Sequence, residues 1–254
     1  MLSRRRQKKY LAKRNEEWQQ YLRAFVDSHD PEALHQLRVT LKKLKALARF
    51  AAACSGENTL KDFNGLKKMF KQAGLIRDAR NHLQLLERFH PAPQGYKDLQ
   101  QQVHTAETEK FIRQSKRYRR QGGRACRRLI AGIQSIPDAS IRDWYALQLV
   151  STGILLTGSS DDWHQARRQI KELLYVEKLL PSPLRTELHL DTQYLDILQD
   201  AIGQWHDAAI VVAAWAGENR ESSQAMIGDA HDKEKVVRQL AETFYLRVDA
   251  LPPG

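Results

Sequence analysis

The chain repeats part of itself at a fixed offset of 129 residues, and this repeat limits the folds that the sequence can adopt. His35 and His164 differ by 164 − 35 = 129 positions, and the same offset relates Arg38 to Arg167. Between positions 35 and 79, ten of forty-five residues are identical to their partners without a gap. Random pairing would give about three identities at average composition. The repeat therefore predicts a duplicated helical hairpin or small bundle.

The periodicity of the apolar residues predicts helices throughout. Glycine and proline cluster at a few points, and nothing between them alternates like a strand. Asp30 can cap a helix and Pro31 suits its first position. The leucine stripe that follows consists of Leu34, Leu37, Leu41, Leu44 and Ala48. We expect an all-α chain whose core contains this stripe.

Helix boundaries follow from the same signals. Besides the helix after Asp30, we expect helices over roughly 6–27, 58–74, 78–89, 95–135, 139–157, 161–180, 184–202, 207–217 and 222–249. Gly74 and Gly203 are expected to end helices, and Asp78 and Asp207 to cap the next ones. The run from Arg4 to Lys9 is expected to be a frayed end. Two repeats, approximately 6–135 and 136–250, would make one domain over 1–254.

The charge balance indicates an anionic partner. The chain has 41 lysine and arginine residues against 30 aspartate and glutamate residues, a formal net charge of +11. Such an excess suits nucleic acid, an anionic membrane surface or polyphosphate. Two cysteines without a CxxC pair fit a reducing cytoplasm, and no export signal is visible. The apolar run 146–157 is too short to span a membrane and is expected to be a buried helix.

Three rows of cations lie at helical spacing. The first basic row contains His35, Arg38, Lys42, Lys45 and Arg49. The second basic row contains His164, Arg167, Arg168, Lys171 and Lys178, with Tyr175 interleaved. The third basic row contains Arg113, Lys116, Arg117, Arg120, Arg124, Arg127 and Arg128, if its helix continues through Gly122 and Gly123. Like charges three or four residues apart repel, so a bound polyanion would stabilise each row. The competing interpretation is that these side chains are solvated around an apolar seam.

Motifs for metal binding or catalysis are missing from the sequence. Nine histidines occur, yet none forms an HxxxH or HExxH pair, and His189-x-Asp191 stands alone. There is no phosphate-binding GxxxxGK[ST] loop, no GxSxG elbow and no gathered carboxylate cluster. We therefore expect neither a metal, a cofactor nor a catalytic residue.

These motifs resemble a known family. The run from His35 to Lys45, its partner His164-x-x-Arg167-x-x-x-Lys171-x-x-x-Tyr175, and the two glycine-to-aspartate spacings resemble the CHAD domain, the conserved histidine α-helical domain. The resemblance spans about Trp18 to Phe244. It implies two pseudosymmetric antiparallel helical bundles around a basic central channel that binds inorganic polyphosphate, with targeting to polyphosphate granules.

Carried over by position, the resemblance implies a set of ligand contacts. They are His35, Arg38, Lys42, Lys43 and Lys45 in the first copy, and His164, Arg167 and Lys171 in the second. The second motif departs from the usual Lys-Arg-Leu-Arg-Tyr, because Glu172 to Leu174 separate Lys171 from Tyr175. Two expected cations are thus missing, and Arg168 is the available replacement. The Glu-x-Glu-x-Lys strand of fused triphosphatase domains has no match, since Glu107-Thr-Glu109-Lys110 has the wrong spacing.

The sequence as a whole favours non-enzymatic binding of polyphosphate or another polyanion. A nucleic-acid-binding module is the first competing hypothesis, because charge alone does not distinguish phosphate backbones. Against it, no helix-turn-helix is visible, and aromatic residues do not interleave with the basic rows as a base-stacking surface needs. A phosphohydrolase and a scaffold for acidic proteins are two further hypotheses.

Overall fold

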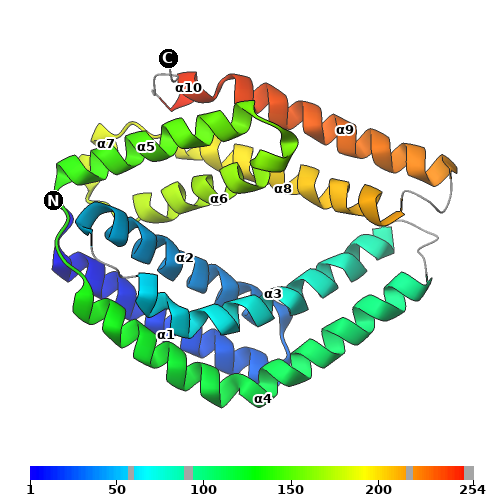
Figure 1. Cartoon of the computed structure of the whole chain (residues 1–254), viewed down its shortest axis with the longest axis horizontal. Coiled ribbons are helices and arrows are strands. Elements are labelled where there is room, and N and C mark those ends of the chain that lie inside the picture. Colours follow the sequence, from blue (N-terminus) through cyan, green and yellow to red (C-terminus); the bar gives the residue numbers. More distant parts are fainter. Residues whose placement is uncertain (57–59, 89–93, 216–219, 249–254) are drawn as a thin grey trace. The chain divides into compact units, whose positions relative to one another are not determined.

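The computed structural model of the chain confirms the predicted all-α class (Figure 1). The structure describes residues 1–56, 60–88, 94–215 and 220–248. Within these ranges the one pairing of extended backbone is an isolated bridge between Leu2 and Ile136. Internal contacts divide the chain into two units, Leu2–Ile136 and Pro137–Gly254, the second also including Met1.

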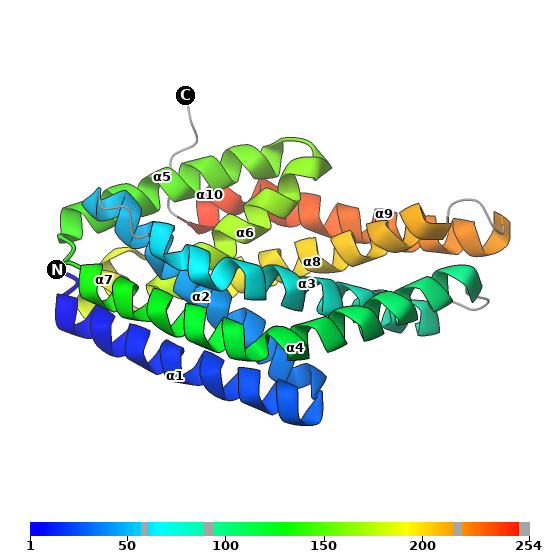
Figure 2. The same ribbon diagram turned by 60° about the horizontal axis from the view of Figure 1, so that its bottom comes forward.

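The unit Leu2–Ile136 is a ring of four helices. They are α1 (Arg4–Ser28), α2 (Pro31–Ser55), α3 (Leu60–Arg88) and α4 (Gln94–Gly132). Each helix packs against the next, and α1 also packs against α4, which closes the ring. α3 and α4 run side by side in both views (Figures 1 and 2). As a result α2 and α4 occupy opposite corners of this unit.

The unit from Pro137 onward has the same order of contacts. Its helices are α5 (Asp138–Thr157), α6 (Ser160–Glu177), the short α7 (Ser182–Glu187), α8 (Thr192–Trp215), α9 (Arg220–Glu242) and the short α10 (Phe244–Arg247). α5 packs against α6, α6 against α8, α8 against α9, and α9 back against α5. Here α6 takes the place in the ring that α2 takes in the other unit.

The start of α2 and its apolar stripe follow the sequence prediction. The Asp30 carboxylate accepts hydrogen bonds from the backbone N–H groups of Glu32 (2.9 Å) and Ala33 (3.2 Å), and Pro31 occupies the first turn. The five stripe residues are at most 5% exposed: Leu34 4%, Leu37 0%, Leu41 0%, Leu44 0% and Ala48 2%. The leucine stripe therefore fixes which face of α2 points inward.

The predicted helix ends at Gly74 and Gly203 are wrong. Gly74 lies inside α3 and Gly203 inside α8, so Asp78 and Asp207 cap no helix. A glycine inside a helix costs only about 1 kcal/mol relative to alanine. That cost is small beside the apolar burial of α3 along α4, so the helix continues. Asp78 instead forms an ion pair with Arg77 at 2.5 Å.

Other boundaries also differ from the sequence prediction. The N-terminal run is not frayed, because α1 begins at Arg4, Ser3 caps it, and Leu2 is fully buried and bridged to Ile136. α6 ends at Glu177, earlier than expected. α5 is buried on one side only, since Leu147 is 68% exposed. α4 does continue unbroken through its glycine pair.

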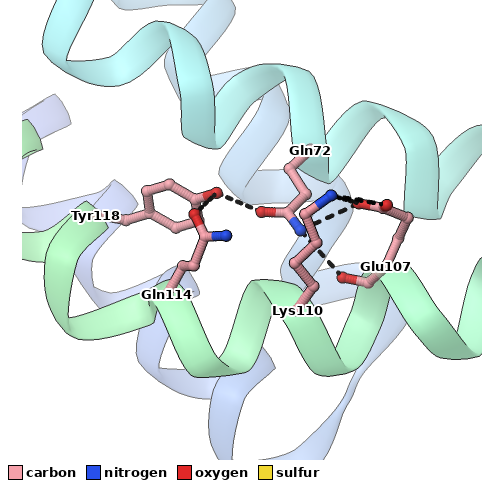
Figure 3. A network of polar contacts seen from close by, with 5 residues as sticks. All are labelled: Gln72, Glu107, Lys110, Gln114 and Tyr118. Atoms are coloured by element: carbon pink, nitrogen blue, oxygen red, sulfur yellow. Dashed lines mark hydrogen bonds and ion pairs between the residues drawn. The ribbon is translucent and has the colours of Figure 1, made fainter.

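A polar network centred on the buried Gln72 and Tyr118 joins α3 to α4 (Figure 3). The Tyr118 hydroxyl donates to Gln72 Oε1 and lies 2.9 Å from Gln114 Oε1. Gln72 Nε2 donates to Glu107 Oε2 at 3.1 Å, and Lys110 Nζ donates to Glu107 Oε1 at 3.0 Å. Burial raises the pKa of the Tyr118 phenol, and Glu107 adds to the rise, so the hydroxyl stays a donor at neutral pH. The network fixes the register of the two helices.

This network predicts a partner-dependent loss of stability. Tyr118→Phe leaves the amide oxygen of buried Gln72 without its donor, and we expect a cost of about 1–3 kcal/mol in the free energy of unfolding. Adding Gln72→Leu removes the unsatisfied amide, so the double variant should be at least as stable as Tyr118→Phe alone. Urea unfolding of the wild type, Tyr118→Phe, Gln72→Leu and the double variant measures this. Strictly additive losses would contradict the network.

Candidate anion-binding surface

The first basic row lies on α2, at the border of its leucine stripe. Most of its members reach solvent: His35, Lys45 and Arg49 are exposed, and Lys42 and Lys43 are half-buried. Arg38 differs, because it is only 8% exposed. The structure thus brings all of the predicted residues together on one helix, but Arg38 does not lie on an open surface.

Arg38 spans the gap between α2 and α3. Its Nη1 donates to the backbone carbonyl of Phe70 at 3.0 Å, and its Cζ lies 4.8 Å from the centre of the Phe70 ring. Its Nε is buried without a hydrogen-bond partner among the described residues. Burial lowers the pKa of Arg38 to about 10, with Arg77 adding to the fall and Asp78 opposing it. The guanidinium therefore remains charged at neutral pH.

Arg167 makes the same contact in the other unit. Its Nε donates to the backbone carbonyl of Gln199 at 2.9 Å. The donors and acceptors are related by the repeat, since 38 + 129 = 167 and 70 + 129 = 199. One arginine in each unit thus joins the helix that carries the basic row to the following long helix of its ring.

The second basic row lies on α6. His164 and Arg168 are exposed, whereas Arg167, Lys171 and Tyr175 are half-buried. Burial raises the pKa of the Tyr175 phenol, although Arg167 opposes the rise. Tyr175 therefore offers a neutral hydroxyl beside the cations. The last cation of the row, Lys178, lies just past the end of α6.

Two residues beside these rows were missed by sequence reasoning. The His206 ring on α8 lies 5.1 Å from the His164 ring. Its counterpart in the repeat is Arg77, because 77 + 129 = 206, and Arg77 acts electrostatically on Arg38. The offset of 129 residues pairs these two basic positions, but an arginine paired with a histidine is not an identity and was therefore overlooked.

A cavity of about 910 Å³ adjoins the first basic row within the unit Leu2–Ile136. Its lining includes His35 of α2, Arg77 and Arg80 of α3, and His104 and Thr108 of α4. Burial lowers the pKa of His104, and Arg80 adds to the fall. The recess beside the first basic row is thus lined by basic side chains together with the carboxylates of Asp30, Glu32 and Glu109.

The third basic row lies on a different face. Arg113, Lys116, Arg117, Arg120 and Arg124 are all located on α4, and all five are exposed. Because α2 and α4 occupy opposite corners of their ring, the outward sides of these helices face away from each other. Arg113 also pairs with Glu109 at 3.4 Å. Within this unit, the first and third rows thus lie on helices at opposite corners of the ring.

Metal-binding clusters and membrane-spanning helices are both missing from the described ranges. No group of three or more histidine, cysteine, aspartate or glutamate side chains is placed there to hold a metal ion. In the same part of the chain, no helix combines the length and the apolar character that crossing a membrane requires.

Comparison with known proteins gives one family and one fold. The family model described as CHAD domain matches residues 9–216. Among solved structures, the crystal structure of the CHAD domain from the plant Ricinus communis superimposes with a TM-score of 0.63 at 17% sequence identity. The match covers 98% of this chain and 92% of that one. No curated protein matches the sequence.

Proposed function

Because this chain belongs to the CHAD domain family, we propose that it binds inorganic polyphosphate through the basic faces of α2 and α6. The first and second basic rows, with Lys43, are the proposed contacts. Binding would occur without hydrolysis, and in the cell it would associate the protein with polyphosphate granules. Other polyanions are weaker ligands in this proposal.

The observation that carries the proposal is the recurrence of one arrangement in two units. In each unit, the helix with the His-x-x-Arg pattern buries its apolar stripe and directs histidine and lysine outward. In each unit, an arginine of that helix is bonded to the neighbouring helix. Chance placement of solvated lysines would not be expected to repeat with these contacts.

The chemistry of the rows suits a chain of phosphates. Lysine supplies mobile point charges and arginine supplies planar paired donors, and both bind phosphate oxygens. An extended polyphosphate presents charge at every unit, so it can run along a helix face and relieve the repulsion between successive cations. Tyr175 and the paired rings of His164 and His206 add donors beside the second row.

The proposal also includes joint use of the two rows. A chain long enough to engage both rows would be held by two contacts at once. The second contact then forms at high effective concentration and adds avidity. A chain too short to reach both rows lacks this gain. Chain-length dependence is therefore the property that distinguishes two linked rows from one row.

Matched charge reversals test the proposal. We expect Lys45→Glu with Arg49→Glu on α2, or Arg168→Glu with Lys171→Glu on α6, to lower the affinity for long polyphosphate by at least about tenfold. Short chains should lose less, because they gain no avidity. The α2 variant should be the more damaged, since the second motif lacks two cations. Fluorescence anisotropy with labelled long and short chains measures both losses.

The control has the same change of charge on another face. Arg120→Glu with Arg124→Glu alters two residues of the third row on α4. It should reduce long-chain affinity clearly less than the α2 variant does. Thermal melts show whether each variant is folded. Equal losses in all three variants would mean that net charge alone determines binding, and wild-type affinity in folded α2 and α6 variants would exclude these rows.

Absence of turnover is the other expected property. Three acidic side chains near the basic rows have structural partners: Asp30 caps α2, Asp162 accepts from the Ser159 backbone N–H, and Glu109 pairs with Arg113. Polyphosphate incubated with the pure protein and magnesium should keep its length on a gel. Phosphate release that scales with protein concentration and survives repurification would overturn this part of the proposal.

A further inference from the structure

Gly74 lies directly beneath the guanidinium of Arg38. A Cβ atom at position 74 would lie 2.7 Å from Arg38 Nη1 and 3.6 Å from its Cζ. Phe70, whose carbonyl accepts from Arg38, is one helical turn before Gly74. A helix carbonyl has a second lone pair beyond its intrahelical bond. A methyl group at position 74 would require the Arg38 guanidinium to move from its present position beside that lone pair.

Gly203 has the same relation to Arg167. A Cβ atom at position 203 would lie 2.5 Å from Arg167 Nη2 and 2.8 Å from its Cζ. The accepting carbonyl belongs to Gln199, again one turn before the glycine. All three positions follow the repeat, because 38, 70 and 74 become 167, 199 and 203 on adding 129. The contact is thus a recurring device of both units.

We propose that Gly74 and Gly203 are positioning residues for polyanion binding. Each leaves space for an arginine of the basic row to bond a backbone carbonyl of the neighbouring helix, and we call this contact the clamp. This inference rests on the proposed function. Neither glycine touches the ligand or carries charge. Their role is to let Arg38 hold α2 against α3, and Arg167 hold α6 against α8, so that the exposed lysines and histidines of each row keep one arrangement.

The clamp also assigns a distinct role to Arg38 within the first row. At 8% exposure it presents little surface to a ligand, while its planar group lies between the Phe70 carbonyl and ring. Its buried charge adds to the potential of the row, and its hydrogen bond sets the position of α2. His35, Lys45 and Arg49 are exposed and are the proposed direct contacts of the row.

The test is a double-mutant cycle on the full chain. The proteins are the wild type, Gly74→Ala, Arg38→Ala and the double variant, with Gly228→Ala as the matched control. Gly228 is also inside a helix, and a Cβ there meets nothing within 4 Å. Each protein is melted without ligand and then titrated with labelled long-chain polyphosphate. If Gly74→Ala acts by displacing the arginine, its effect disappears once Arg38 is removed. If it acts on the fold in general, its effect is the same in both cases.

The expected changes in melting temperature and affinity depend on whether Arg38 is present. Gly228→Ala should raise the melting temperature by about 2–4 °C, because alanine favours the helix. Gly74→Ala should give no such rise in melting temperature, because the methyl group displaces Arg38. For the same reason it should lower the affinity for long-chain polyphosphate by roughly three- to tenfold. In the Arg38→Ala background the same substitution should raise the melting temperature and leave affinity unchanged.

Several outcomes would overturn the clamp. A wild-type affinity together with a raised melting temperature in Gly74→Ala would show that Arg38 needs no glycine. Equal effects of Gly74→Ala in both backgrounds would show that it acts elsewhere. If Arg38→Ala does not fold, the Gly203 and Arg167 cycle makes the same test in the other unit. If the wild type binds no polyphosphate, the proposed function fails, yet the melting temperatures still decide whether the clamp exists.

Discussion

Burial of the leucine stripe on α2 is the constraint on which the arrangement of the first basic row depends. Its leucines are at most 4% exposed, so the rotation of the helix about its axis is fixed by the core. The histidine and lysines between them must then point toward solvent or along the border with α3. In the other unit α6 does the same with Trp163, Ala166, Ile170 and Leu173, none of which is exposed. The position of the charges is thus a consequence of apolar packing.

The arginines add a second, more specific constraint. Apolar packing sets rotation well but tolerates small slides between helices. A guanidinium bonded to one backbone carbonyl, close above a glycine, favours one register of the two helices over its neighbours. Leaving this cation largely buried has an energetic cost, which its hydrogen bond and its contact with Phe70 offset in part. The same contact occurs at the same offset in both units. Both units thus keep the arginine contact despite its energetic cost.

Much of the fold could be predicted from the sequence, and the failures have physical causes. Periodicity predicted the helices, the Asp30 cap and the buried stripe because these depend on neighbours within a turn or two. Gly74 and Gly203 were taken for helix ends because local rules favour glycine there. Their actual surroundings include an arginine 36 residues earlier in the chain, since 74 − 38 = 36. Burial of Arg38 and the pairing of His164 with His206 are likewise tertiary facts that spacing along one helix does not contain.

Competition binding tests the central claim most directly, because charge alone would attract any polyanion. The protein is loaded with labelled long-chain polyphosphate and challenged with equal phosphate equivalents of unlabelled long polyphosphate, short polyphosphate, duplex DNA and single-stranded RNA at roughly physiological salt. We expect long polyphosphate to displace the label at the lowest concentration, short chains at a higher one, and the nucleic acids less well than long chains. Displacement by DNA or RNA as effective as that by long polyphosphate would contradict it and favour a nucleic-acid-binding module.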